Sequence, residues 1–269
     1  MRDYSLAYLT ASHSTVPEAV AIAAELGYGH VGLRLQPNAA GAPHQRLIGD
    51  AALMRDTLSR MADTGVQVFD LEIIRIGEVF DPAHHLPLLE AGAQLKAQAV
   101  LVAADDSHEP RLAEHFARLC EVMRPYGLSA NLEFMPWTGV KDAQAALRVL
   151  KAADSPANGA ILVDALHFGR STSSLADIAA IPREWLRYAQ ICDAQAGLHF
   201  STEELIHTAR QERQLPGEGT IDLRGLFAQL PADLPVSVEV PDLARAAQMG
   251  DKAWAALALA AAQQVLGDA

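Results

Sequence analysis

Polar side chains lie at or near the ends of four consecutive apolar segments from Leu128 onward. They are Glu133 in LSANLEF, Asp164 in GAILVDALHF, Gln190 in LRYAQICDA and Glu239 in PVSVEV. Three carboxylates that converge in an apolar setting repel one another and need a compensating positive charge, which a divalent cation supplies most simply. Oxygen ligands favour Mn²⁺, Mg²⁺ or Co²⁺ over Zn²⁺. The four residues therefore predict a shared metal site.

A structural role is the alternative for each of these residues taken alone. A single buried acid at a strand end is more often a helix cap or the partner of an arginine than a metal ligand. The repetition on consecutive segments, always at the same end, is what favours a metal.

Three further side chains lie close to these positions in the sequence. His167 follows Asp164 by three residues and could donate a proton to a leaving hydroxyl or hold a substrate oxygen. Cys192 shares the side of the strand with Gln190, one layer further along, and we expect it to serve in packing. Asp193 comes at odd spacing from Gln190 and should point away from the ligand set, as a supporting or loop-capping residue.

These residues can act together only in a fold that brings the ends of the strands together. The alternation of β-rich and helical segments along the chain predicts such a fold. Amphipathic helical stretches separate eight β-rich segments: Ser5–Ala11, His30–Leu35, Val66–Ile74, Ala99–Asp105, Leu128–Phe134, Gly159–Phe168, Leu186–Ala194 and Pro235–Val240. The pattern predicts an α/β fold, a (β/α)₈ TIM barrel, with residues 1–269 as one domain. In this fold the carboxyl ends of the strands meet at one mouth, where catalytic residues lie.

A doubly wound open sheet is the competing architecture. It would usually show a glycine-rich turn after the first strand, but the turn here, ASHSTVPEA, contains no glycine. The two longer loops, Gln36–Ile48 and Ala194–Thr220, are where we expect function to be built.

Composition limits the partners of the chain. The formal net charge of −12 argues against binding to a nucleic-acid backbone, which needs a basic surface. The longest apolar run, Ala253–Ala262, is too short to span a bilayer. The N-terminal MRDYSLAYLT does not read as a signal peptide, and the two cysteines form no CxxC motif. We therefore expect a cytoplasmic protein with a small-molecule substrate and neither nucleic-acid nor membrane partners.

The order of these residues resembles a known group. Glu133, the D-x-x-H of Asp164–His167, Gln190 with Asp193, and Glu239 are similar to the pattern of the xylose-isomerase-like TIM-barrel superfamily of sugar and sugar-phosphate isomerases and epimerases. The resemblance spans essentially the whole chain. It implies Glu133, Asp164, Gln190 and Glu239 as metal ligands, the two glutamates as acid–base groups, and His167 as a residue that contacts substrate.

One ligand departs from the epimerase pattern. Many ketose epimerases carry His where this chain has Gln190, and glutamine there resembles a branch that contains bacterial 3-dehydroshikimate dehydratases. The segment ERQLPGEGTIDL resembles a loop of that branch if its arginine is Arg213, and Arg75 occupies the place of a carboxylate-binding arginine. A similar loop also occurs in the epimerases, where Arg213 would hold a substrate hydroxyl, so the loop does not separate the two.

Several other side chains are candidates for the substrate pocket. Trp137 in LEFMPW could form a wall of it, whereas Phe134 is better explained by core packing. Arg34 and Glu72 also lie near strand ends and could face the same pocket.

The leading hypothesis is a metal-dependent isomerase or epimerase that acts on a small sugar or polyhydroxy-carbonyl compound by proton transfer through a metal-bound enediolate. The alternative is a lyase, similar to 3-dehydroshikimate dehydratase, because the first half of both reactions is identical. A barrel that binds a metal–ligand complex without turnover is disfavoured by the presence of both Glu133 and Glu239. The endonuclease branch would need more histidine ligands and a basic surface. The resemblance also implies a homo-oligomer.

Overall fold

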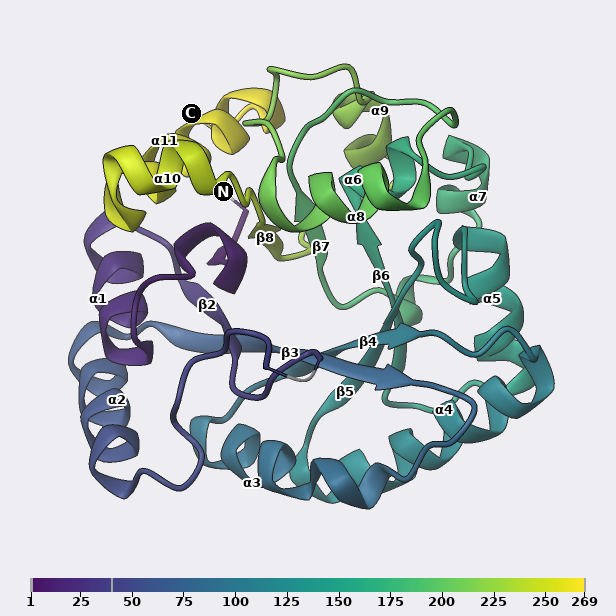
Figure 1. The fold of residues 1–269 in the computed structure, drawn as a ribbon, viewed down its shortest axis with the longest axis horizontal. Helices are drawn as coiled ribbons and strands as arrows, with labels where there is room; N and C mark the ends of the chain where they lie inside the picture. The colour runs from purple at the N-terminus through teal and green to yellow at the C-terminus, as the bar shows by residue number, and fades with distance from the viewer. Residues whose placement is uncertain (1, 40, 269) are drawn as a thin grey trace.

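The strands of the protein close into a parallel barrel (Figure 1). The computed structural model describes residues 2–39 and 41–268. Neighbouring strands pair in chain order, and the last strand pairs with the first, Leu6 lying opposite Val238. The strands are β1 (Tyr4–Leu6), β2 (His30–Arg34), β3 (Gln67–Ile76), β4 (Ala99–Ala104), β5 (Ser129–Glu133), β6 (Gly159–Asp164), β7 (Ala189–Ile191) and β8 (Val236–Val238).

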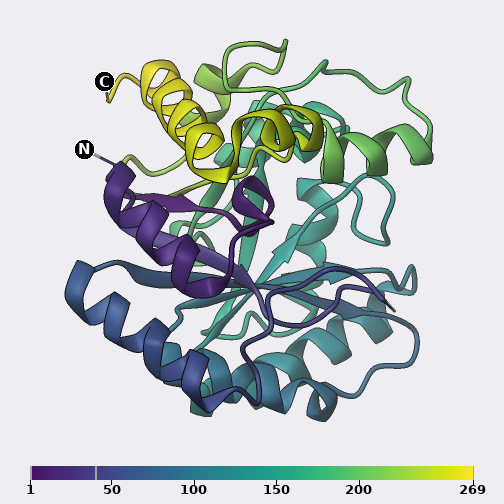
Figure 2. The ribbon, with the colours of Figure 1, turned by 60° about the vertical axis from the view of Figure 1, so that its left-hand side comes forward.

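Helices connect the strands and surround the barrel (Figures 1 and 2). The first of them shows why they form where they do: Thr15 and Glu18 make a capping box, and Gly27 ends the helix in the left-handed conformation at φ 86°. The helices are α1 (Val16–Leu26), α2 (Ala51–Thr64), α3 (Leu86–Leu95), α4 (Glu109–Met123), α5 (Ala143–Ala152), α6 (Ala165–Gly169), α7 (Leu175–Ala179), α8 (Thr202–Gln211), α9 (Leu223–Ala228), α10 (Leu243–Met249) and α11 (Asp251–Leu266).

The core has two parts because each barrel strand is buried on both faces. The larger part lies between strands and helices and includes Phe116 and Trp254. The smaller part fills the inside of the barrel around Phe69, Leu101 and Tyr188. The interior of the barrel is therefore filled with side chains rather than open as a pore.

The predicted (β/α)₈ barrel is confirmed, and each of the predicted β-rich segments overlaps a strand. Several segments were predicted too long, as in Leu186–Ala194, where the strand covers only Ala189–Ile191. Tyr8–Ala11 is a 3₁₀ helix rather than the end of the first strand. The strand predicted over Gly159–Phe168 ends at Asp164, because the Asp164 carboxylate caps α6 by accepting hydrogen bonds from the backbone N–H groups of Leu166 (2.7 Å) and His167 (3.2 Å).

The segment predicted as the loop Ala194–Thr220 contains the helix α8. Ser201 and Glu204 form a capping box at its start. The sequence STEELIHTARQ carries this signal, an S-x-x-E pattern before a helical stretch, so the helix was predictable.

Across residues 2–39 and 41–268, none of the helices is both long enough and apolar enough to cross a membrane.

Candidate active site and metal centre

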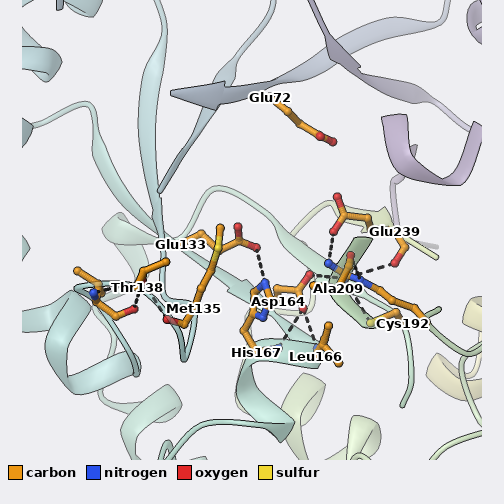
Figure 3. Close-up of polar contacts among 12 residues, drawn as sticks. Glu72, Glu133, Met135, Thr138, Asp164, Leu166, His167, Cys192, Ala209 and Glu239 are labelled. Atoms are coloured by element: carbon orange, nitrogen blue, oxygen red, sulfur yellow. Dashed lines mark hydrogen bonds and ion pairs between the residues drawn. The ribbon is translucent and has the colours of Figure 1, made fainter. Parts of the chain in front are cut away.

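The four proposed metal ligands all lie at the carboxyl ends of neighbouring strands, as predicted. Glu133 and Asp164 are the last residues of β5 and β6, Gln190 lies within β7, and Glu239 directly follows β8. All four side chains are buried, with 0–3% of each residue exposed. Figure 3 shows the carboxylates of Glu133, Asp164 and Glu239 directed into one space.

Arg213 neutralises two of these carboxylates. Its Nη1 lies 2.6 Å from Asp164 Oδ2 and its Nη2 lies 2.7 Å from Glu239 Oε2. Burial alone would raise the pKa of Asp164, but the guanidinium and the hydrogen bonds to the carboxylate lower it overall. The Nε of Arg213 donates to the carbonyl of Ala209 in α8, so the protein itself holds this side chain in place.

Glu133 makes no such ion pair with an arginine, and its environment differs. Burial, with the charges of Asp164 and Glu239, holds the pKa of Glu133 well above its usual range. His167 lies beside it, with its Nε2 3.6 Å from Glu133 Oε1. Burial lowers the pKa of His167 to about 4, so the imidazole is neutral near pH 7.

The donor set fits a divalent cation. Ligand atoms of Glu133, Asp164 and His167 lie within 4.8 Å of one another. Both amide atoms of Gln190 are buried and have no hydrogen-bond partner among the described residues. A buried amide without a partner is costly, and an ion in contact with its oxygen would satisfy it. Glu239, which is paired with Arg213, lies outside this close cluster.

The predicted substrate-binding residues fall in different places. Trp137 packs edge-on against the ring of His167, with 5.0 Å between ring centroids, so it lies at the site. Arg213 is also at the site, but bound to carboxylates of the protein. Arg75 pairs with Asp105 through two contacts, of 2.8 and 2.5 Å, with one quarter of its side chain exposed. Its role in binding a substrate carboxylate stays a prediction.

Asp193 anchors the loop that carries Arg213. Its buried carboxylate accepts hydrogen bonds from the backbone N–H groups of Ala194, Gly217 and Ile221 at 2.9, 3.0 and 3.1 Å. Asp193 and Gln214 also form a backbone bridge. This is the supporting role that the sequence predicted for Asp193.

Cys192 is buried and packs beside Arg213, with 3.4 Å between its Sγ and Nη1. Cys120 is also buried, and both thiols are free, as expected from their spacing.

Sequence reasoning did not foresee that Arg34 and Glu72 form one buried ion pair. Arg34 Nη2 lies 2.6 Å from Glu72 Oε2. The two residues are 38 positions apart, and only the pairing of β2 with β3 places them opposite each other. A charged residue near the end of each strand was the only signal in the sequence.

Comparisons with known proteins agree with this architecture. The model of the xylose isomerase-like TIM barrel family matches residues 20–258. The chain belongs to this family. No functionally curated protein matches the sequence.

Several solved structures are similar to this chain over almost their whole length. The structure of the IolI protein with a bound zinc atom has a TM-score of 0.81 at 16% identity, covering 98% of both chains. The probable 3-DHS dehydratase AsbF of Bacillus anthracis has a TM-score of 0.73 at 16% identity, covering 94% of this chain and 97% of its own. The D-allulose 3-epimerase of Methylomonas sp. has a TM-score of 0.68 at 14% identity, covering 98% of both chains. At these identities the likeness establishes the fold.

Proposed function

We propose that the protein is a divalent-metal-dependent enzyme that removes a proton next to the carbonyl of a small polyhydroxylated substrate. The observation that carries this proposal is the cluster of Glu133, Asp164 and His167 beside the unpaired amide of Gln190. Glu133, Asp164 and Gln190 would hold the ion, with Glu239 as the fourth predicted ligand. Oxygen ligands favour Mn²⁺, Mg²⁺ or Co²⁺. The zinc atom in the IolI structure belongs to that protein and does not identify the ion of this chain.

An ion bound there would act as a Lewis acid and make the α-proton of a nearby carbonyl compound more acidic. The residues of the chain would do the remaining work. Glu133, in its carboxylate form, takes the proton. Glu133 then carries the proton and can return it, and His167, whose neutral imidazole lies beside Glu133, would donate a hydrogen bond to a substrate oxygen. Arg213 fixes the orientation of Asp164 and Glu239 and is held in turn by its loop.

Epimerisation and dehydration, which both begin with such proton removal, make different demands on the acid–base groups. Epimerisation needs two groups on opposite faces of the substrate, whereas loss of a β-hydroxyl can use one base and one acid on the same side. Glu239 is held by Arg213 at 2.7 Å, but Glu133 and His167 lie together. This asymmetry favours a lyase that dehydrates a cyclic hydroxy-keto acid of the 3-dehydroshikimate type.

A ketose isomerase or epimerase is the second candidate. The observation that favours it is the environment of Glu239, where burial raises the pKa to about 8. The pKa of Glu133 is raised as well, so the site holds two carboxyl groups whose affinity for a proton is increased, as a two-base reaction requires.

A substrate panel tests the proposal. The Mn²⁺-loaded protein is incubated with 3-dehydroshikimate, followed by ultraviolet absorbance of an aromatic product, and with ketoses in deuterated water, followed by exchange of the α-proton. Aromatic product supports the lyase, and exchange without dehydration supports the isomerase or epimerase. Glu133→Gln should abolish the activity and the surface variant Glu121→Gln should retain it. Metal-loaded protein that does neither reaction would refute the proposal.

A further inference from the structure

The wall of the barrel opposite the proposed metal site carries one buried ion pair. Arg34 ends β2, and Glu72 lies opposite it on β3. The residues are 8% and 1% exposed. The pairing of β3 with β4 shifts register between Leu71 and Ile74, and such an irregularity redirects side chains at a barrel rim. The ring of Tyr8 lies 4.6 Å from the guanidinium carbon of Arg34.

This pair is only half formed. Arg34 donates from Nη2 to Glu72 Oε2, but Arg34 Nε and Glu72 Oε1 are both buried without a hydrogen-bond partner among the described residues. The pair of Arg75 and Asp105 shows the complete arrangement, in which Nε and Nη2 each bind one carboxylate oxygen. The Arg34–Glu72 pair therefore leaves one donor and one acceptor unused and shielded from solvent.

The pair faces the same space as the acid–base groups. Figure 3 shows Glu72 across the site from Asp164 and His167, with its carboxylate directed toward that of Glu239. Burial is the main cause of the raised pKa values of Glu133 and Glu239, and the charge of Glu72 adds to both, consistent with this proximity.

We propose that Arg34 Nε and Glu72 Oε1 bind one hydroxyl group of the substrate, on a carbon beyond the two that enolise. A hydroxyl is the small group that can accept a hydrogen bond from a guanidinium and donate one to a carboxylate at once. A carboxylate or phosphate at this point would be repelled by Glu72, so the pair selects a neutral hydroxylated end. This inference rests on the proposed function and narrows its substrate to compounds with a hydroxyl at that distance.

Binding measurements on the Mn²⁺-loaded protein test the inference. The ligands are D-allulose, 3-dehydroshikimate and the singly deoxygenated derivatives of each, measured by calorimetry. We expect the wild-type protein to bind one deoxygenated derivative about 10- to 100-fold more weakly than its parent, because a hydrogen bond to a charged group is lost there. In Arg34→Leu/Glu72→Leu the preference should fall to less than about twofold.

The double variant is chosen because replacing both members of a buried pair by apolar residues is often tolerated, whereas removing one leaves a buried charge. Asp56→Asn, which breaks the exposed pair of Asp56 and Arg60 on α2, is the matched control and should keep the full preference. A double variant that keeps the preference while turnover persists would overturn this inference alone. A wild-type protein that binds neither parent compound would overturn both this inference and the proposed function.

Discussion

The loop that carries Arg213 depends on one carboxylate, and Asp193→Ala removes it. Asp193 is 1% exposed and accepts three backbone hydrogen bonds, from Ala194, Gly217 and Ile221. A hydrogen bond to a charged group contributes about 1.5–3 kcal/mol, and a buried donor left without a partner costs about 1–3 kcal/mol. Since bonds to one acceptor are not additive, we expect the free energy of unfolding to fall by about 3–5 kcal/mol.

Urea denaturation followed by circular dichroism measures this loss. Asp222→Ala is the matched control, because Asp222 caps α9 with a single exposed hydrogen bond to Gly225. Loss of such a cap costs about 1 kcal/mol. If Asp193→Ala destabilises the protein no more than Asp222→Ala, the carboxylate does not anchor the loop and the reasoning is refuted.

Three further predictions concern other buried groups. Arg213→Met leaves Asp164 and Glu239 without their counter-charge, so we expect the metal-free protein to lose about 3–5 kcal/mol of stability. Arg213→Lys should recover part of this loss. An unchanged urea midpoint in Arg213→Met would contradict the prediction. Cys120 and Cys192 are buried, which raises the pKa of each thiol to about 12, so a chromogenic disulfide reagent should react only after denaturation. A thiol that reacts rapidly in the folded protein would be inconsistent with this burial. Hydrogen bonds from Arg111 lower the pKa of Asp106, so the stability that they contribute is present above about pH 4, the ordinary carboxylate value, and is lost as the pH falls through the lower folded value. Asp106→Asn should therefore weaken the pH dependence of stability on the acid side, and an identical acid profile in both proteins would contradict the assignment.

The sequence was sufficient for the barrel and for the strand-end ligands because both follow from local patterns. Apolar segments alternate with amphipathic helices, and a polar residue at a strand end stands out against them. Glu133, Asp164, Gln190 and Glu239 were located in this way, and the structure brings their strand ends to one mouth. Their roles as ligands stay predictions.

Contacts between distant segments could not be read from local patterns. Arg213 lies 49 positions from Asp164 along the chain, and its ion pair depends on how the loop after β7 folds back. The partner of Arg75 and the pairing of Arg34 with Glu72 depend in the same way on strand register. The strand predicted through His167 was wrong because the cap formed by Asp164 competes with strand continuation. The homo-oligomer and the cytoplasmic location remain predictions.

Metal binding is the central claim, and electron paramagnetic resonance of added Mn²⁺ measures it directly, because bound and free ions give different signals. We predict one bound Mn²⁺ per chain, with the affinity lowered at least about tenfold in Glu133→Gln, since one charged ligand is lost. The surface variant Glu121→Gln should bind as the wild-type protein does. A protein that takes up no divalent ion, or a Glu133→Gln variant that binds it as tightly as the wild type, would contradict the account.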